Sequence, residues 1–151
     1  MRAVRIGAAL LAVLGLGGCE YLWNLGNQAP LVRDVSELFG AHEITLEKPI
    51  CNMIGTTRGA TCELRLTADQ VAAAVRGLGL TEMRAGRAAS LGQAGCRLAS
   101  ADHSGAPVRG YESGRQPKAS TLRNGAAFSY LRLYYRADTR EVCLEVSYAY
   151  G

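Results

Sequence analysis

The sequence has few of the residues from which catalytic and metal sites are built. Its only histidines, His42 and His103, have no ligand-like spacing to any cysteine. There is no CxxC pair, no Gly-x-Ser-x-Gly turn and no HExxH pair, the patterns typical of zinc sites, serine hydrolases and metalloproteases. We therefore expect no metal and no cofactor, and the sequence gives an enzyme little support.

One tripeptide, Asp102-His103-Ser104, does contain the residue types of a hydrolase triad. Adjacent residues cannot aim at one another as that mechanism requires. In a segment rich in Gly and Ser, they are more typical of a solvated turn.

The chain also lacks a strong charge of one sign. It has 17 basic and 13 acidic residues, and two of the basic ones, Arg2 and Arg5, stand at the start. Binding to nucleic acid calls for a concentrated basic stripe, so we expect no nucleic-acid partner.

No apolar run approaches the roughly 20 residues that span a bilayer. The most apolar run, Ile6–Gly18, follows Arg2 and Arg5 and closes in Leu-Gly-Gly before Cys19. A charged start, a short apolar middle and small residues before a cut are typical of a secretory signal. The Leu-Gly-Gly-Cys segment resembles the lipobox of bacterial lipoproteins, and this resemblance covers residues 1–19 only.

The resemblance implies that residues 1–18 are removed as a signal peptide. Cys19 would then carry a diacylglycerol and an amide-linked acyl chain such as palmitate, and two or more chains anchor a protein stably. In lipoproteins of two-membrane bacteria an Asp after the cysteine favours the inner membrane, so Glu20 indicates the periplasmic face of the outer membrane. An ordinary cleaved signal or a buried N-terminal helix is the alternative.

Beyond Cys19 there is an even set of four cysteines: Cys51, Cys62, Cys96 and Cys143. Because an exported chain folds in an oxidising compartment, we predict two disulfides. Three connectivities are open, and we favour Cys51–Cys62 with Cys96–Cys143. In the chain-entropy model, loops of these sizes contribute about 3 and about 4 kcal/mol.

We expect a lipidated tether over residues 19–31 and one α+β domain over residues 32–151. In the tether, Trp23 and its apolar neighbours suit either the headgroup region or the edge of the domain. Helical spacing then predicts a short helix over Leu31–Phe39, and alternation predicts a strand over Glu43–Glu47.

A second strand, around Cys62–Leu66, should form a hairpin with the first, closed by Cys51–Cys62. The main helix follows, since Thr67 and Gln70 form a capping box ahead of an apolar stripe that ends near Gly79. Leu80–Arg84 is a candidate strand. Periodicity is lost over residues 85–125. Because this is long for a structureless connection, we expect part of it to be ordered by Cys96 or to serve binding.

The C-terminal region predicts an antiparallel hairpin. One face of residues 130–135 and 142–150 is apolar, and the other carries Tyr130, Arg132 and Tyr134 beside Glu141 and Glu145. Opposite charges on adjacent strands favour cross-strand pairs. The economical architecture is a helix packed on an antiparallel sheet.

Two stretches are candidate binding surfaces. The first is a basic, aromatic-bearing loop, and the second is the polar face of the hairpin, because Tyr and Arg are enriched where proteins bind one another. Their residues are Arg109, Tyr111, Arg115, Lys118 and Arg123 in the loop, and Tyr130, Arg132 and Tyr134 on the hairpin.

From the anchor, the braced domain and the missing catalytic pattern, we expect a non-catalytic binding or accessory module of the cell envelope, with a protein or glycan partner. An inhibitor or immunity-type protein that blocks a hydrolase or toxin would need the same features. A small envelope hydrolase is a third hypothesis, which requires convergent polar groups in a concave pocket.

Overall fold

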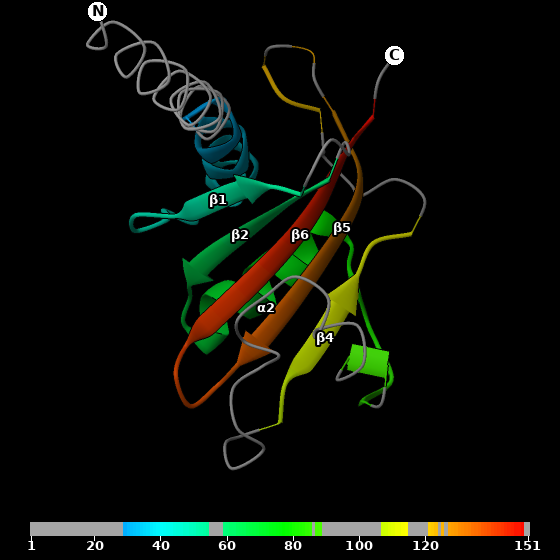
Figure 1. Ribbon diagram of the computed structural model, residues 1–151. Coiled ribbons are helices and arrows are strands. Elements are labelled where there is room, and N and C mark those ends of the chain that lie inside the picture. The colour runs from blue at the N-terminus through cyan, green and yellow to red at the C-terminus, as the bar shows by residue number, and fades with distance from the viewer. Residues whose placement is uncertain are drawn as a thin grey trace, which may run out of the picture.

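The sheet is antiparallel throughout and has six strands in the order β1-β2-β6-β5-β4-β3. The computed structural model describes residues 29–54, 59–85, 87–88, 107–114, 121–123, 125 and 127–149. Its elements are β1 (Ile50–Met53), β2 (Gly59–Arg65), α2 (Ala68–Leu78), β3 (Thr81–Glu82), β4 (Arg109–Glu112), β5 (Ala127–Arg136) and β6 (Glu141–Ala149), and residues 29–40 form an earlier helix. The predicted single α+β domain with an antiparallel sheet is confirmed (Figure 1).

Both helices lie against one face of the sheet, which we call the inner face (Figure 1). Alternate residues of the strands point into the core on this face, among them Leu64, Leu133 and Leu144. The helix of residues 29–40 buries its predicted apolar stripe, which consists of Leu31, Val35, Leu38 and Phe39. Helix α2 buries Val71, Ala74 and Leu78. The helix begins at or before residue 29, so the last residues of the expected tether, 29–31, are helical.

The capping box of α2 is confirmed. The Thr67 hydroxyl accepts a hydrogen bond from the Gln70 backbone N–H at 3.3 Å, and the Gln70 side chain accepts one from the Thr67 N–H at 2.9 Å. Gly79 ends the helix in the left-handed conformation, at φ 64°, which only glycine adopts without steric cost.

The predicted strand over Glu43–Glu47 is wrong. The first helix instead ends in a tight turn in which Glu43 has φ 61° and Ile44 donates its N–H to the Phe39 carbonyl. Ile44 is buried by this turn, so its apolar side chain reflects a helix end rather than a strand. The first strand, β1, begins after Pro49.

The β1–β2 hairpin carries the predicted disulfide. Cys51 and Cys62 face one another in the register, with Cα atoms 4.0 Å apart and an S–S bond between them. Cys143 is also disulfide-bonded, while Cys96 lies outside the described residues, so the Cys96–Cys143 pairing stays a prediction. One disulfide is thus described in full, where two were expected.

Residues 85–125 are not irregular throughout. Residues 109–112 form β4, which pairs with β5, and Leu80–Arg84 contains the two-residue strand β3. The sequence Arg-Gly-Tyr-Glu of β4 is too short to show an alternation of apolar and polar residues. The strand is stabilised by pairing with the longer strand β5 beside it. Gly110 in β4 faces Ala88 so closely that a Cβ on it would lie 2.8 Å from the Ala88 Cβ.

The C-terminal hairpin is confirmed as β5 and β6, joined by a turn over residues 137–140. Its polar side belongs to the outer face of the sheet, opposite the helices. Part of this face is buried, because the chain after β3 folds back over it and forms a small cluster of Met83, Ala88, Tyr134 and Cys143. Cys143 therefore lies on the outer side as expected, yet it is fully buried.

Candidate functional site

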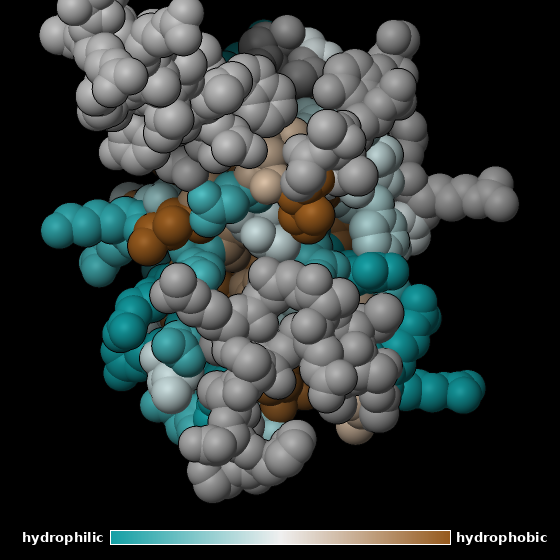
Figure 2. Space-filling view, in the orientation of Figure 1, coloured by the Kyte–Doolittle hydropathy of each residue, from teal (hydrophilic) through white to brown (hydrophobic). Residues whose placement is uncertain are grey.

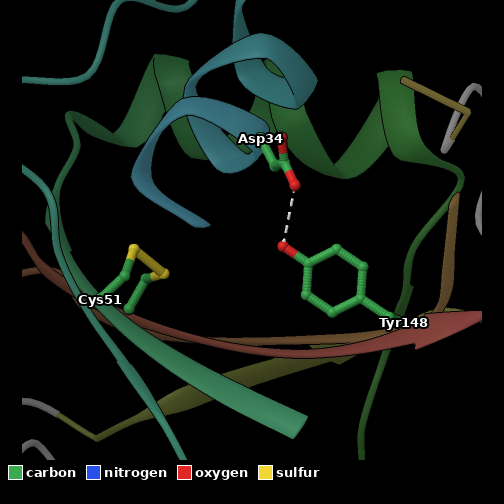
Figure 3. Close-up of a disulfide and its surroundings, with 4 residues drawn as sticks. Asp34, Cys51 and Tyr148 are labelled. Atoms are coloured by element: carbon green, nitrogen blue, oxygen red, sulfur yellow. Dashed lines mark hydrogen bonds between the residues drawn. A yellow bond between two sulfur atoms is a disulfide. The ribbon is translucent and has the colours of Figure 1, made fainter. Parts of the chain in front are cut away.

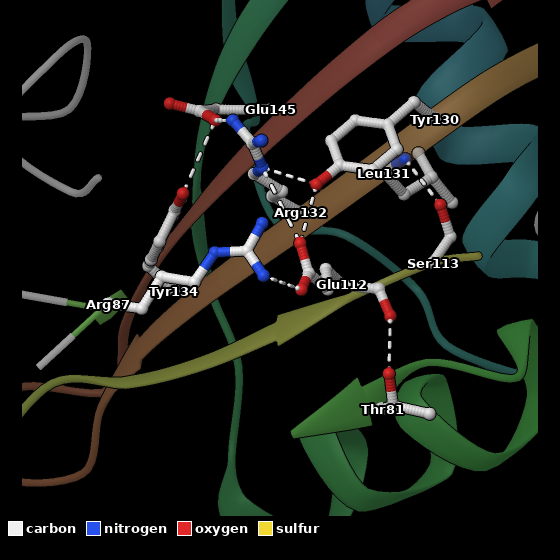
Figure 4. Close-up of polar contacts among 9 residues, drawn as sticks. All are labelled: Thr81, Arg87, Glu112, Ser113, Tyr130, Leu131, Arg132, Tyr134 and Glu145. Atoms are coloured by element: carbon white, nitrogen blue, oxygen red, sulfur yellow. Dashed lines mark hydrogen bonds and ion pairs between the residues drawn. The ribbon is translucent and has the colours of Figure 1, made fainter. Parts of the chain in front are cut away.

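The outer face carries a cluster of polar side chains from three adjacent strands (Figure 4). Register places Arg132 of β5 directly between Glu112 of β4 and Glu145 of β6. Two tyrosines of β5 and one arginine from the turn after β3 complete it. We call this group the outer-face cluster: Arg87, Glu112, Tyr130, Arg132, Tyr134 and Glu145.

Arg132 is the centre of the outer-face cluster. Its Nη1 lies 3.5 Å from Glu145 Oε2, and its Nε lies 4.0 Å from Glu112 Oε2. The Nε also donates to the Tyr130 hydroxyl, and the guanidinium carbon lies 4.6 Å from the centre of the Tyr130 ring. Such cation–π contacts contribute about 0.5–1 kcal/mol at exposed sites. Arg132 is therefore contacted by Glu112, Glu145 and Tyr130, while its side chain remains 27% exposed to solvent.

Glu112 joins three elements. Its Oε1 pairs with Arg87 Nη1 at 2.8 Å, and its Oε2 accepts a hydrogen bond from the Tyr130 hydroxyl at 2.7 Å. Its backbone carbonyl accepts one from the Thr81 hydroxyl at 3.3 Å. Strands β3, β4 and β5 are therefore tied together at this residue.

The next residue, Ser113, fixes the end of β4 against β5. Its hydroxyl accepts a hydrogen bond from the Leu131 N–H at 2.9 Å, and its own N–H donates to the Leu131 carbonyl at 2.9 Å. This reciprocal pair extends the ladder beyond Glu112 and holds that carboxylate in place.

The two phenols of the outer-face cluster remain protonated donors at neutral pH. Burial raises the pKa of Tyr130, and its hydrogen bond to Glu112 raises it further. Burial also raises the pKa of Tyr134 far above its ordinary value of 10, and the nearby Glu145 charge adds to the effect. Neither tyrosine is therefore suited to act as a general base, because a base must lose its proton near the working pH.

Arg132 stays charged for a related reason. Burial alone lowers its pKa, but the hydrogen bond to Tyr130 and the Glu145 charge together raise it above the ordinary value. Two arginines thus balance two carboxylates within the outer-face cluster. Each charge therefore has a partner of opposite sign, and the side chains of the cluster hold one another in place.

The structure brings only two residues of the predicted basic loop together, Arg109 and Tyr111, with the Arg109 guanidinium carbon 5.6 Å from the centre of the Tyr111 ring. Arg109 is on β4, where Nη2 pairs with Glu82 Oε1 at 2.9 Å, an exposed pair. Tyr111 points into the core and is buried. Arg123 lies elsewhere, with its backbone N–H bound to the Glu37 carboxylate. Arg115 and Lys118 lie outside the described residues.

The second predicted surface is brought together in part. Tyr130 and Arg132 are half-buried and in contact, whereas Tyr134 is buried and reaches the cluster only through its hydroxyl, 3.4 Å from Glu145 Oε2. The lipidation candidate Cys19 lies outside the described residues. Cys51 and Cys62 are buried in their disulfide.

Arg87 was not among the predicted site residues. It stands in a stretch without periodicity and reaches Glu112 only because the chain folds back over the sheet after β3. Glu112 was not among them either, since the strand that carries it was not predicted. Their charges were the only signal in the sequence.

Within the described ranges, no group of three or more His, Cys, Asp or Glu side chains is placed to hold a metal ion. Neither of the described helices is long and apolar enough to cross a membrane. No family model, curated protein or solved structure matches this chain.

Proposed function

We propose that this chain is a lipid-anchored periplasmic module of the bacterial cell envelope that acts by binding a protein or a glycan. Residues 1–18 serve as the signal peptide, Cys19 carries the acyl chains, and the outer face of the sheet makes the contact. The protein performs no chemistry of its own.

The observation that carries the proposal is the construction of the outer-face cluster. Arg132 and Tyr130 are held in fixed positions by two carboxylates and by each other. A side chain that is already ordered loses little entropy on binding, where a mobile one costs about 0.5–1.5 kcal/mol. Arginine and tyrosine are also the residues over-represented at the energetic centres of interfaces.

The cysteines support an exported location. The described Cys51–Cys62 disulfide persists only where thiols are not kept reduced. Cys143 pairs with Cys96 in this proposal, which fastens the segment around residue 96 to the outer side of β6. The second disulfide then borders the outer-face cluster, because Cys143 is the register partner of Tyr134.

Site-specific photo-crosslinking in native envelopes tests the binding face. A photoreactive amino acid replaces Thr81, exposed on β3 beside its register partner Glu112, and in a matched control it replaces Arg76, exposed on α2 behind the sheet. We expect a discrete adduct from position 81 that position 76 does not give, and the adduct should weaken severalfold in Arg132→Ala.

Equal adducts from both positions, or none from position 81, would overturn the proposed binding face. A hydrolase or toxin recovered as the adduct would assign the protein to the inhibitor or immunity class instead. The anchor is tested separately by intact-mass measurement of the protein purified from the membrane fraction. We expect acylation at Cys19, and loss of both acylation and membrane association in Cys19→Ala. The same mass should show that the other four cysteines form two disulfide bonds.

A further inference from the structure

The exposed large hydrophobic side chains of the described chain lie in β1 and directly after it. These are Ile50, the first residue of the strand, and Ile54, the residue that follows Met53, at 58% and 44% exposure. They lie on the same side of the strand, because Cys51 faces the core and side chains alternate. The Ile54 N–H donates to the Gly59 carbonyl at 2.9 Å, which continues the ladder to that residue. The two isoleucines therefore share the outer face.

Figure 2 looks onto this outer face and shows hydrophobic atoms over β1 with hydrophilic atoms between them. The intervening side chain on that face is Asn52. β1 is an edge strand, and the sheet edge on the other side, β3, has two exposed polar residues, Thr81 and Glu82. Among the described residues, the exposed large hydrophobic side chains thus lie at one edge of the sheet.

The proposed anchor brings a bilayer within reach of this edge. Residues 20–28 separate Cys19 from the described helix of residues 29–40, and the ten extended steps from residue 19 to residue 29 span at most about 35 Å. That helix ends in a turn, and β1 begins a few residues later. A tether of this length allows the β1 edge to reach the membrane surface.

Among the described residues next to β1 the charges cancel. Glu47 and Lys48 precede the strand, and Glu63 and Arg65 lie on the neighbouring β2. These four side chains give a contact made here no electrostatic preference for anionic lipid, so its free energy comes mainly from burial of the isoleucine side chains. Burial of apolar surface contributes about 25 cal/mol per Å². The free energy from two isoleucine side chains is small compared with that of an acyl anchor, but it is sufficient to orient a domain that is already tethered.

We propose that Ile50 and Ile54 rest on the lipid bilayer and orient the anchored domain, with the β1 side of the outer face against the membrane and the outer-face cluster on the strands farther from it, β6, β5 and β4. This inference rests on the proposed lipid anchor. It assigns Ile50 and Ile54 a zwitterionic lipid surface as their partner.

Depth-dependent quenching tests the orientation. The acylated full chain carries Trp23→Phe, which removes the single native tryptophan, together with Ile50→Trp or Ile54→Trp. The matched control places tryptophan at Glu82, exposed on the opposite edge. On phosphatidylcholine vesicles with brominated acyl chains, we expect severalfold stronger quenching at positions 50 and 54 than at 82, with little change when salt is raised.

Quenching at positions 50 and 54 that merely equals the quenching at 82 would overturn the inference. Tryptophan shielding that depends on protein concentration and not on lipid would also overturn it, in favour of a second copy of the chain. A protein that fails to sediment with the vesicles at all indicates failure of the anchor itself. The two failures are therefore distinguishable.

Discussion

The Tyr148 hydroxyl, near the end of β6, donates a hydrogen bond to Oδ2 of Asp34 in the helix of residues 29–40, at 3.1 Å (Figure 3). Asp34 is 5% exposed, and its other oxygen, Oδ1, lies 3.2 Å from Arg33 Nη2. The Tyr148 ring packs on Phe128, with 4.9 Å between ring centres. This contact fastens the first described helix to the last strand of the sheet.

Tyr148→Phe is expected to destabilise the domain by about 1–3 kcal/mol, since it removes a hydrogen bond to a buried charged group and keeps the ring. Urea unfolding of the wild type, Tyr148→Phe, Asp34→Asn and the double variant gives the coupling between the two side chains. A coupling energy near zero would show that the contact contributes nothing to stability.

Removing the hairpin disulfide should lower stability without changing the fold. In Cys51→Ala/Cys62→Ala the closed loop is lost, which costs about 3 kcal/mol in the chain-entropy model. Chemical denaturation of this variant, compared with the wild type under non-reducing conditions, measures the difference. Equal midpoints for the two proteins would contradict the expectation.

Local signals predicted the helices and the long hairpin well. The capping box at Thr67 and the stripe from Leu31 to Phe39 are complete within a few turns, so they need no distant partner to be recognised. The alternation of β5 and β6 is long enough to fix which side faces the core. That alternation also placed Arg132 and Glu145 on one face as candidates for a cross-strand pair, and the register of the two strands pairs them.

The errors arose where order depends on distant residues. β4 has four residues and takes its order from β5, and Tyr111 in it is buried only because the register sets it beside Leu133. The alternation around Ile44 satisfied the strand pattern, but a helix end also buries an apolar residue. The outer-face cluster likewise depends on Arg87, which reaches Glu112 through tertiary folding.

Gly77 should show the reverse of the usual glycine effect. Gly→Ala inside a helix ordinarily stabilises by about 0.5–1 kcal/mol. Here a Cβ would lie 2.4 Å from His42 Nδ1, so Gly77→Ala forces the imidazole away and is expected to destabilise by about 1–3 kcal/mol.

Thermal or urea unfolding in two backgrounds checks this expectation. With His42→Ala in place the methyl group has room, and Gly77→Ala should then become neutral or stabilising. A destabilisation of equal size in both backgrounds would show that the His42 ring is not the obstacle.

Stability should fall at alkaline pH through the buried phenols. Burial raises the pKa of Tyr111, Tyr130 and Tyr134 in the folded state, while the unfolded chain titrates near the ordinary value of about 10. Below that value all three are protonated in both states, and their contribution is fully present. As pH rises above it, the unfolded chain releases protons first, so the free energy of unfolding decreases until the folded-state pKa is reached.

Urea unfolding between about pH 8 and about pH 11 should show this decrease, and Tyr134→Phe should make it shallower. An equally steep decrease in that variant, or phenolate absorbance showing that Tyr134 titrates as in a free peptide, would contradict the burial argument.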